Sequence, residues 1–154
     1  VVNKSADEKA GRILRERVLQ ELYFKGYPKI PVDVVDLKLS KAYPPGANSL
    51  AGVVPPQAAG ELTGADALLY CTIEDLHTSF LFSYARTRIA LHFELRSAKT
   101  GETLWRAGYK TTVNSYDISR ARVEMKTYEV YEPALDEAMT KTMATFPGGP
   151  GMVK

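Results

Sequence analysis

Residues 64–113 constrain the fold of this chain more than any other stretch. Residues 67–74 are almost entirely apolar at first, which is typical of a strand covered on both faces. Residues 86–96 alternate between apolar and polar side chains, which predicts a strand with one buried and one exposed face. Gly101, within the turn of residues 99–102, can take the positive φ of a tight hairpin that leads into residues 104–113. Three consecutive antiparallel strands are therefore predicted.

Two amphipathic helices are predicted outside this meander. Ser5 and Glu8 have the spacing of a capping box, and apolar residues recur behind them at helical spacing. A helix is therefore expected over residues 7–25, with Gly26 as its stop. Near the other end, Pro133 stands at a favourable first helical position. The apolar residues that follow it at three- and four-residue spacing are Leu135, Ala138, Met139, Thr142, Met143 and Phe146.

Shorter elements are expected between the first helix and the strands. Residues 27–31 are interpreted as a short strand, which their prolines restrict to an edge or to the strand's own ends. Asp33 is expected to cap a helix over residues 34–42. A second, shorter helix is expected over residues 57–62, with Gly64 just past its end.

The two ends of the chain complete the predicted architecture. Val1 and Val2 are interpreted as the end of a strand, so the chain opens as strand, helix, strand, which requires a right-handed parallel crossover. The expected fold is α/β in the mixed α+β sense. It combines a mixed β-sheet, this N-terminal crossover, the antiparallel three-strand meander and flanking helices, in two or three layers. Residues 1–147 are expected to form one domain and residues 148–154 a disordered Gly/Pro tail.

Composition excludes several classes of function. The formal net charge of the 154 residues is only +2 and the signs are interspersed, so a dedicated nucleic-acid-binding stripe is not expected. No apolar run reaches the roughly 20 residues that span a bilayer. Cys71 is the only cysteine, which excludes an internal disulfide. Because it lies in an apolar run, it is expected to be a buried small side chain and not a reactive thiol.

Three segments together resemble one family. Residues 1–5 (VVNKS) are similar to the end of its first strand, and Gly26-Tyr27 with Pro31-Val32 and Val35-Asp36 to its crossover. Gly64-Ala65-Asp66-Ala67 with residues 99–105 (KTGETLW) resembles its central strand and hairpin. The family is that of bacterial lipoproteins of unknown function typified by a neisserial genome-derived surface antigen. Its fold is similar to the amino-terminal domain of the translocation protein TolB and, distantly, to the curli-secretion lipoprotein CsgG.

This resemblance covers residues 1–113 and implies a location as well as a fold. It implies an exported periplasmic protein, held at the outer membrane by a lipid on a cysteine that precedes Val1. It also implies an auxiliary role in an envelope transport system. The family brings no catalytic residues and no cofactor, so none is predicted for this chain.

The polar residues of the meander offer two alternatives that involve chemistry. His77 and His92 are the only histidines, and pairing of their strands would bring His92 and Glu94 towards Glu74, which is a possible metal-ligand set. The other reading is a set of polar residues on an exposed sheet face. Asp66, His77 and Ser79 supply the residue types of a hydrolase triad, but Ser79 lacks the glycines of a nucleophile elbow.

An aromatic segment lies where the first two predicted strands meet. Phe80, Phe82 and Tyr84 alternate with smaller residues there. Either the strands extend and bury these rings, or a loop projects them towards a partner. Tyrosine is also enriched at interfaces. The candidate interaction surface therefore comprises Phe80, Phe82, Tyr84, Tyr116, Tyr128 and Tyr131.

The preferred hypothesis is a non-catalytic envelope lipoprotein domain that acts as a protein-interaction module in an assembly or transport complex. Its expected partners are other envelope proteins, with a homodimer as one possibility, and it would touch the membrane only through the lipid anchor. The alternative is a ligand- or metal-binding enzyme domain that uses His77, His92 and nearby carboxylates.

Overall fold

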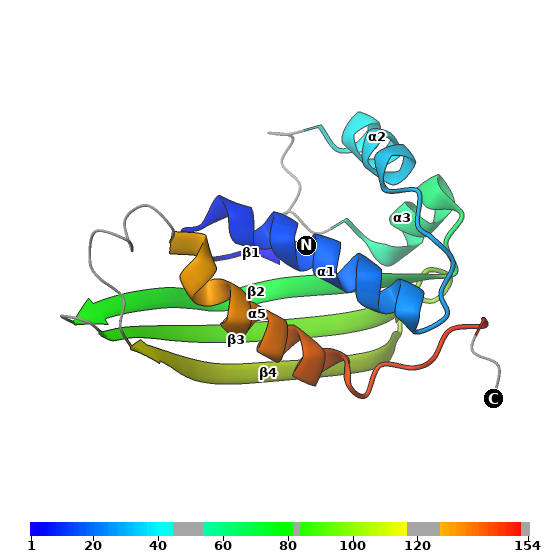
Figure 1. Cartoon of the computed structure of the whole chain (residues 1–154). Helices are drawn as coiled ribbons and strands as arrows, with labels where there is room; N and C mark the ends of the chain where they lie inside the picture. The colour runs from blue at the N-terminus through cyan, green and yellow to red at the C-terminus, as the bar shows by residue number, and fades with distance from the viewer. Residues whose placement is uncertain (45–53, 82–83, 117–126, 152–154) are drawn as a thin grey trace.

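The computed structural model describes residues 1–44, 54–81, 84–116 and 127–151. Within these residues, four strands form one sheet in the order β1-β2-β3-β4. Helices α1 and α5 lie across one face of this sheet (Figure 1). The elements are β1 (Val2–Asn3), α1 (Glu8–Phe24), α2 (Val32–Ala42), α3 (Pro56–Thr63), β2 (Ala67–Leu81), β3 (Tyr84–Ser97), β4 (Thr103–Tyr116) and α5 (Thr127–Met143).

The sheet is mixed, as predicted. β1 pairs parallel with β2, with Val2 opposite Thr72, whereas β2, β3 and β4 pair antiparallel. The predicted strand at residues 27–31 is wrong, because these residues form no strand and the parallel partner of β1 is β2. Pro28 and Pro31 lack the N–H groups that a strand needs. The crossover from β1 therefore runs through α1, α2 and α3 before it returns to the sheet.

The strands are longer than the sequence pattern indicated. β2 and β3 pair continuously from Ala67 opposite Ser97 to Leu81 opposite Tyr84. A bulge at Glu74 shifts the register between Ile73 and Asp75. One extra residue exchanges the faces of all later side chains, so the two-residue pattern of β2 breaks there. This bulge explains why the predicted strand stopped at residue 74.

Helix α1 begins later than the capping-box pattern predicted. Its cap is Asp7, whose Oδ1 accepts hydrogen bonds from the backbone N–H groups of Lys9 and Ala10 at 2.9 and 3.3 Å. Ser5 instead donates its hydroxyl to Asn3 Oδ1 at 2.6 Å. Aspartate caps a helix about as well as serine. The helix therefore begins after Asp7, two residues later than the predicted cap at Ser5.

The predicted stop of α1 is confirmed. Gly26 has a φ of 82°, and its N–H bonds to the carbonyl of Tyr23 while the N–H of Tyr27 bonds to that of Leu22. This is the Schellman arrangement, which needs a left-handed residue directly after the helix. Glycine takes that conformation without the steric cost of a Cβ.

The other helices differ from prediction mainly at their starts. Asp33 lies inside the first turn of α2 and does not cap it. α3 ends at Gly64 as predicted, with a φ of 74°. α5 begins at Thr127, so Pro133 lies inside the helix and not at its first position. A proline there removes the hydrogen bond to the carbonyl four residues earlier and its ring crowds that carbonyl, and burial of the surrounding helix outweighs this cost.

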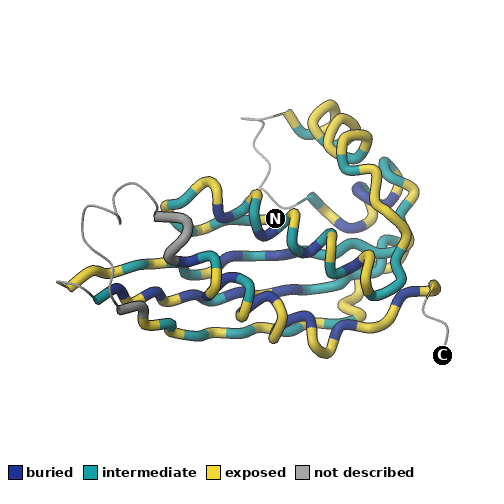
Figure 2. The backbone as a smooth tube through the Cα atoms, in the orientation of Figure 1, coloured by how far each residue is buried: buried dark blue, intermediate teal, exposed yellow. Residues whose placement is uncertain are grey.

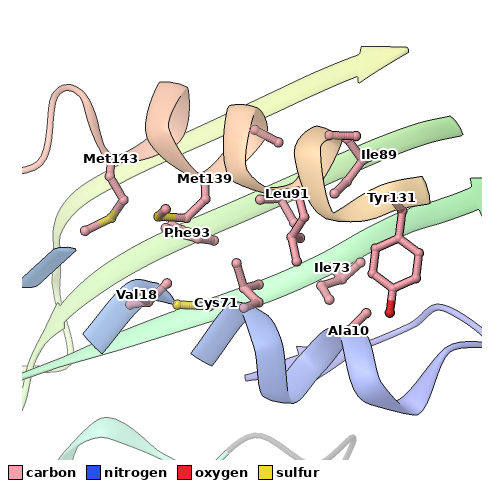
Figure 3. Packing of buried hydrophobic residues seen from close by; sticks show 14 of the residues in the cluster. Ala10, Val18, Cys71, Ile73, Ile89, Leu91, Phe93, Tyr131, Met139 and Met143 are labelled. Atoms are coloured by element: carbon pink, nitrogen blue, oxygen red, sulfur yellow. The ribbon is translucent and has the colours of Figure 1, made fainter. Parts of the chain in front are cut away.

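The core fills the space between the sheet and the pair α1 and α5 (Figure 3). α1 contributes one residue per turn to it, and β3 contributes every second residue. All six apolar-pattern residues predicted after Pro133 are buried there, which confirms that face of the helix. The core residues with the largest fully buried side chains are Phe93, Leu14, Ile73, Ile89, Leu135 and Met143.

The molecule has two layers, whereas the sequence left two or three layers open. The sheet face opposite α1 and α5, which we call the outer face, carries the alternate residues of β2, β3 and β4. The alternating burial along these strands is visible in Figure 2. Leu68 and Tyr70 are only half-buried on it, so residues 67–74 are not covered on both faces as predicted. The hydroxyl of Tyr70 donates a hydrogen bond to the carbonyl of Val54 at 2.6 Å.

The chain after α5 turns back against the end of α1. Gly149 and Gly151 donate backbone hydrogen bonds to the carbonyls of Lys25 and Gly26 at 2.7 and 3.0 Å. A Cβ on Gly149 would lie 2.6 Å from the backbone carbon of Gly26, so only glycine permits this approach. Contrary to the predicted disordered tail from residue 148, the chain is thus held as far as Gly151. Residues 152–154 lie outside the described part of the chain.

Candidate functional site

The aromatic segment at the end of the β2–β3 hairpin is the first predicted surface. The strands extend through most of it, because β2 ends at Leu81 and β3 begins at Tyr84. Phe82 lies outside the described residues. Phe80 and Leu81 nevertheless remain 40% and 64% exposed. Tyr84 is half-buried and donates its hydroxyl to Asn114 Oδ1 at 2.8 Å.

The three later tyrosines do not extend this surface together. Tyr131 is only 2% exposed, and its ring lies between α5 and Ala10 of α1 (Figure 3). Burial, with the nearby Asp7 carboxylate as a second cause, raises the pKa of its hydroxyl. Its inclusion in an interaction surface was therefore wrong, because a partner cannot reach it. Tyr116 and Tyr128 belong to β4 and α5, but their side chains are not among those described.

The histidines and carboxylates are not gathered as the metal hypothesis required. His92 lies opposite Thr72, and His77 lies opposite Arg88. Glu74, displaced by the bulge, accepts a hydrogen bond from Lys4 Nζ at 2.7 Å. Glu94 accepts hydrogen bonds from Arg96 and Thr103, which lower its pKa. Among the described residues, no group of three or more metal-ligating side chains is present.

The triad alternative fails on distance. Asp66 precedes β2, whereas His77 lies well along this strand, so the two are about 35 Å apart at the usual rise of a strand. The Ser79 hydroxyl donates weakly to the carbonyl of Arg86 at 3.4 Å and faces no histidine partner in the part of the chain described. These three residues therefore cannot act as a nucleophile with its base.

Cys71 is buried, as predicted. It is 3% exposed, and desolvation raises the pKa of its thiol to about 12. Because the thiolate is the reactive species, we expect no reaction of folded protein with a thiol-specific disulfide reagent at pH 8, and one equivalent of reaction after unfolding in urea. Absorbance of the released thiolate measures both. Rapid reaction of folded protein would contradict the buried position.

An apolar surface that the sequence interpretation missed lies on α1 and α2. Tyr23 and Phe24, adjacent at the end of α1, are 62% and 76% exposed, and their ring centroids are 6.1 Å apart. Val34 and Leu37 of α2 are 50% and 56% exposed, and Ile30 between the helices is 38% exposed. We call these five residues the α1–α2 surface. Shallow hollows adjoin the two rings.

A sequence signal for this surface does exist. The buried stripe of α1 consists of Ala10, Leu14, Val18 and Leu22, at four-residue intervals. Tyr23 and Phe24 directly follow the last member of this stripe, so the helical period turns them away from the core. Two large aromatic side chains off the buried stripe, next to an apolar second helix, indicate an exposed apolar surface.

An ion pair connects helix α2 to α1. The described part of it buries no residue, which Figure 2 shows as a largely exposed helix. Arg15 of α1 donates two hydrogen bonds to Asp36, at 2.8 and 2.5 Å. These bonds lower the pKa of the Asp36 carboxyl. The attachment is therefore complete at neutral pH and weakens as the pH falls through the lowered pKa and Asp36 takes up a proton.

Comparison with known proteins agrees with this geometry. A sequence profile of the family described as "Putative lipoprotein GNA1162-like" matches residues 1–134. The chain belongs to this family. Its fold is similar to the crystal structure of lipoprotein GNA1162 from Neisseria meningitidis, at 21% identity and a TM-score of 0.64, over 88% of this chain and 93% of that one. No curated protein matches the sequence.

A second group of solved structures is similar in fold. The PelC dodecamer from Paraburkholderia phytofirmans matches at 13% identity and a TM-score of 0.56, over 94% of this chain and 80% of that one. A variant of the same dodecamer matches at 12% identity and a TM-score of 0.56, over 97% and 84%. At this identity the likeness shows the fold alone.

Membership of this family has two general implications. A lipoprotein family implies a membrane-anchored location in the cell envelope, and the description of this family names no catalytic activity. None of the helices in the described residues is long and apolar enough to cross a membrane. The resemblance noted from residues 1–113 is thereby confirmed, and the match extends into α5.

Proposed function

We propose that this chain is a non-catalytic periplasmic domain, lipid-anchored at the outer membrane, that assembles with further copies of itself within an envelope complex. The observation that carries the proposal is the exposure of Tyr23 and Phe24, at 62% and 76%. Contiguous apolar surface in contact with water is unfavourable and marks interaction sites in soluble domains. Exposed aromatic rings are also the side chains that contribute most at interfaces.

A second copy is the partner that we propose first. The PelC structures with the same fold are dodecamers, so this architecture is compatible with a ring or similar closed assembly. The hairpin end at Phe80 and Leu81 supplies a second, smaller exposed apolar site. Because a closed ring needs two different patches on each subunit, the α1–α2 surface and the hairpin end together meet that requirement.

Sedimentation velocity of the purified chain tests the assembly. We expect wild-type protein to sediment as an oligomer, and the double variant Tyr23→Ser with Phe24→Ser to sediment as a monomer with an unchanged melting temperature. The matched control is Leu104→Ser, because Leu104 is 58% exposed on β4, away from both patches. It should leave the oligomer intact.

Variants of the hairpin end separate the two contact sites. Phe80→Ser with Leu81→Ser should also yield monomers if the subunits meet head to tail. An oligomer that survives this change but not the α1–α2 change would indicate a two-fold contact through α1 and α2 alone. Wild-type protein that stays monomeric at all concentrations would overturn the proposal.

A further inference from the structure

Positively charged residues that are distant in the sequence lie together on the outer face of the sheet. β3 supplies Arg86, Arg88 and Arg96 to this face, and β4 supplies Arg106 and Lys110. The acidic side chains that share the face are Asp75 and Glu94. Five cationic and two anionic side chains give it a larger excess of positive charge than the whole chain, whose formal net charge is +2.

The two acids pair with only two of these five cations. Glu94 is bonded to Arg96 at 2.8 Å, and Asp75 lies 3.8 Å from Arg88 Nε. Arg86, Arg106 and Lys110 are exposed and form no ion pair with any other described residue. A protein gains no stability from keeping three cations on one face without partners, so these side chains are available to an external anion.

The outer face is also an extended platform. β3 and β4 have 14 residues each, so the platform is about 45 Å long at the usual strand rise. The rows between the cations carry small polar groups: His92 pairs with Gly108, and Arg88 pairs with Thr112. Such a face offers charges and hydrogen-bond donors along its length.

We infer that the outer face binds the surface of an anionic phospholipid bilayer, with Arg86, Arg88, Arg106 and Lys110 against the phosphate groups. The charges are complementary, and a bilayer surface is extended enough to meet cations along the length of the sheet. As a member of a lipoprotein family, the protein is kept within reach of a membrane. One lipid chain holds a protein only marginally, and a cationic surface is the kind of second signal that makes such anchoring stable.

This inference is separable from the proposed self-assembly, because the outer face shares no residue with the α1–α2 surface and only Leu81 with the hairpin end. A soluble acidic protein is the alternative partner, and the outer face favours it less than a bilayer. On β3, the outer-face positions between Arg88 and Glu94 are Ala90 and His92, which offer no large apolar anchor for a protein interface.

Co-sedimentation of the purified chain with vesicles tests the inference. We expect binding to vesicles of equal parts phosphatidylcholine and phosphatidylglycerol, and none to phosphatidylcholine alone. The triple variant Arg86→Gln, Arg106→Gln and Lys110→Gln should lower the partition coefficient about a hundredfold, since each surface cation contributes about a fivefold factor. Binding should also fall steeply with added salt, because the charges are exposed.

The control removes the same number of charges elsewhere. Arg12→Gln, Lys38→Gln and Lys141→Gln are exposed changes in the helices, and should leave vesicle binding within about twofold of wild type. An equal loss in this control would overturn the outer face as the site, as would a lack of binding by wild-type protein. Binding of soluble polyphosphate without binding of vesicles would overturn the bilayer as the occupant. Melting curves of both variants show that they are folded.

Discussion

Replacement of Phe93 with alanine is expected to lower the free energy of unfolding by about 3–5 kcal/mol, the usual cost of removing a buried phenylalanine ring. Phe93 is 0% exposed and stands in the middle of β3, between the sheet and helices α1 and α5. Loss of the ring leaves a cavity lined by residues of three elements, which cannot close without moving a helix. Urea unfolding followed by far-ultraviolet circular dichroism measures the change.

The matched control for this prediction is Phe24→Ala. The same side chain is removed there, but Phe24 is 76% exposed at the end of α1, and alanine favours the helix slightly more. We expect a change within about 0.5 kcal/mol. Equal losses at both positions would show that the core does not lie between the sheet and this pair of helices. Because domains of this size are stable by about 5–15 kcal/mol, Phe93→Ala should remain folded enough to measure.

The second large effect is expected at Gly60 in α3. A Cβ at this position would lie 2.5 Å from the Cβ of Ala98 and 3.3 Å from the carbonyl oxygen of Ala65. Alanine in place of glycine normally stabilises a helix by up to about 1 kcal/mol. Here we expect Gly60→Ala to destabilise the protein by about 1–3 kcal/mol, because the helix must move away from the end of the β2–β3 pair. The sign of the change is therefore diagnostic.

A second substitution tests the cause of that effect. Ala98→Gly removes the atom that the new Cβ would meet, so the double variant should recover most of the stability that Gly60→Ala loses. The coupling free energy from the four unfolding curves measures this recovery, and contacts of this kind couple by about 0.5–3 kcal/mol. Strictly additive effects would mean that α3 does not pack against Ala98 as described.

Period-two patterns explain which parts of the fold were predictable. The alternation in residues 86–96 determined both the strand and its buried face, since Ile89, Leu91 and Phe93 are all buried. The same rule failed in β2, because the bulge at Glu74 exchanges the two faces and disguises the second half of the strand. A bulge leaves no fixed residue type in the sequence, so only the pairing of the strands reveals it.

Errors at the helix ends have a common cause. Ser5 and Asp7 are both good capping residues, and the choice between them depends on the hydrogen bond that Ser5 makes with Asn3. Pro133 is tolerated inside α5 because Ala134 and Leu135, which follow it, are fully buried. The contacts of Gly149 with the end of α1 are likewise tertiary. Helix propensities and capping preferences cannot decide between two helix ends when the difference in their free energies is smaller than the contribution of one tertiary contact.

The candidate surfaces show the same limit. The exposed ring of Phe80 lies in the segment that the sequence indicated, but the burial of Tyr131 depends on how α5 packs against α1. Tyr23 and Phe24 were readable from the helical period, once Leu22 is recognised as the last buried residue of α1. The charge of the outer face was not readable, because Arg88 and Lys110 come together only through the pairing of β3 with β4.

The parallel pairing of β1 has a consequence for the order in which the domain forms. β2, β3 and β4 are neighbours in sequence, so their hairpins close over short loops. Lys4 beside β1 reaches Glu74 across seventy residues, which is a much costlier loop to close for a strand of two residues. We therefore expect the β2–β4 meander to fold first and β1 to pair with its edge later. Although β1 is made before the meander, it is therefore expected to be among the last elements to find its place.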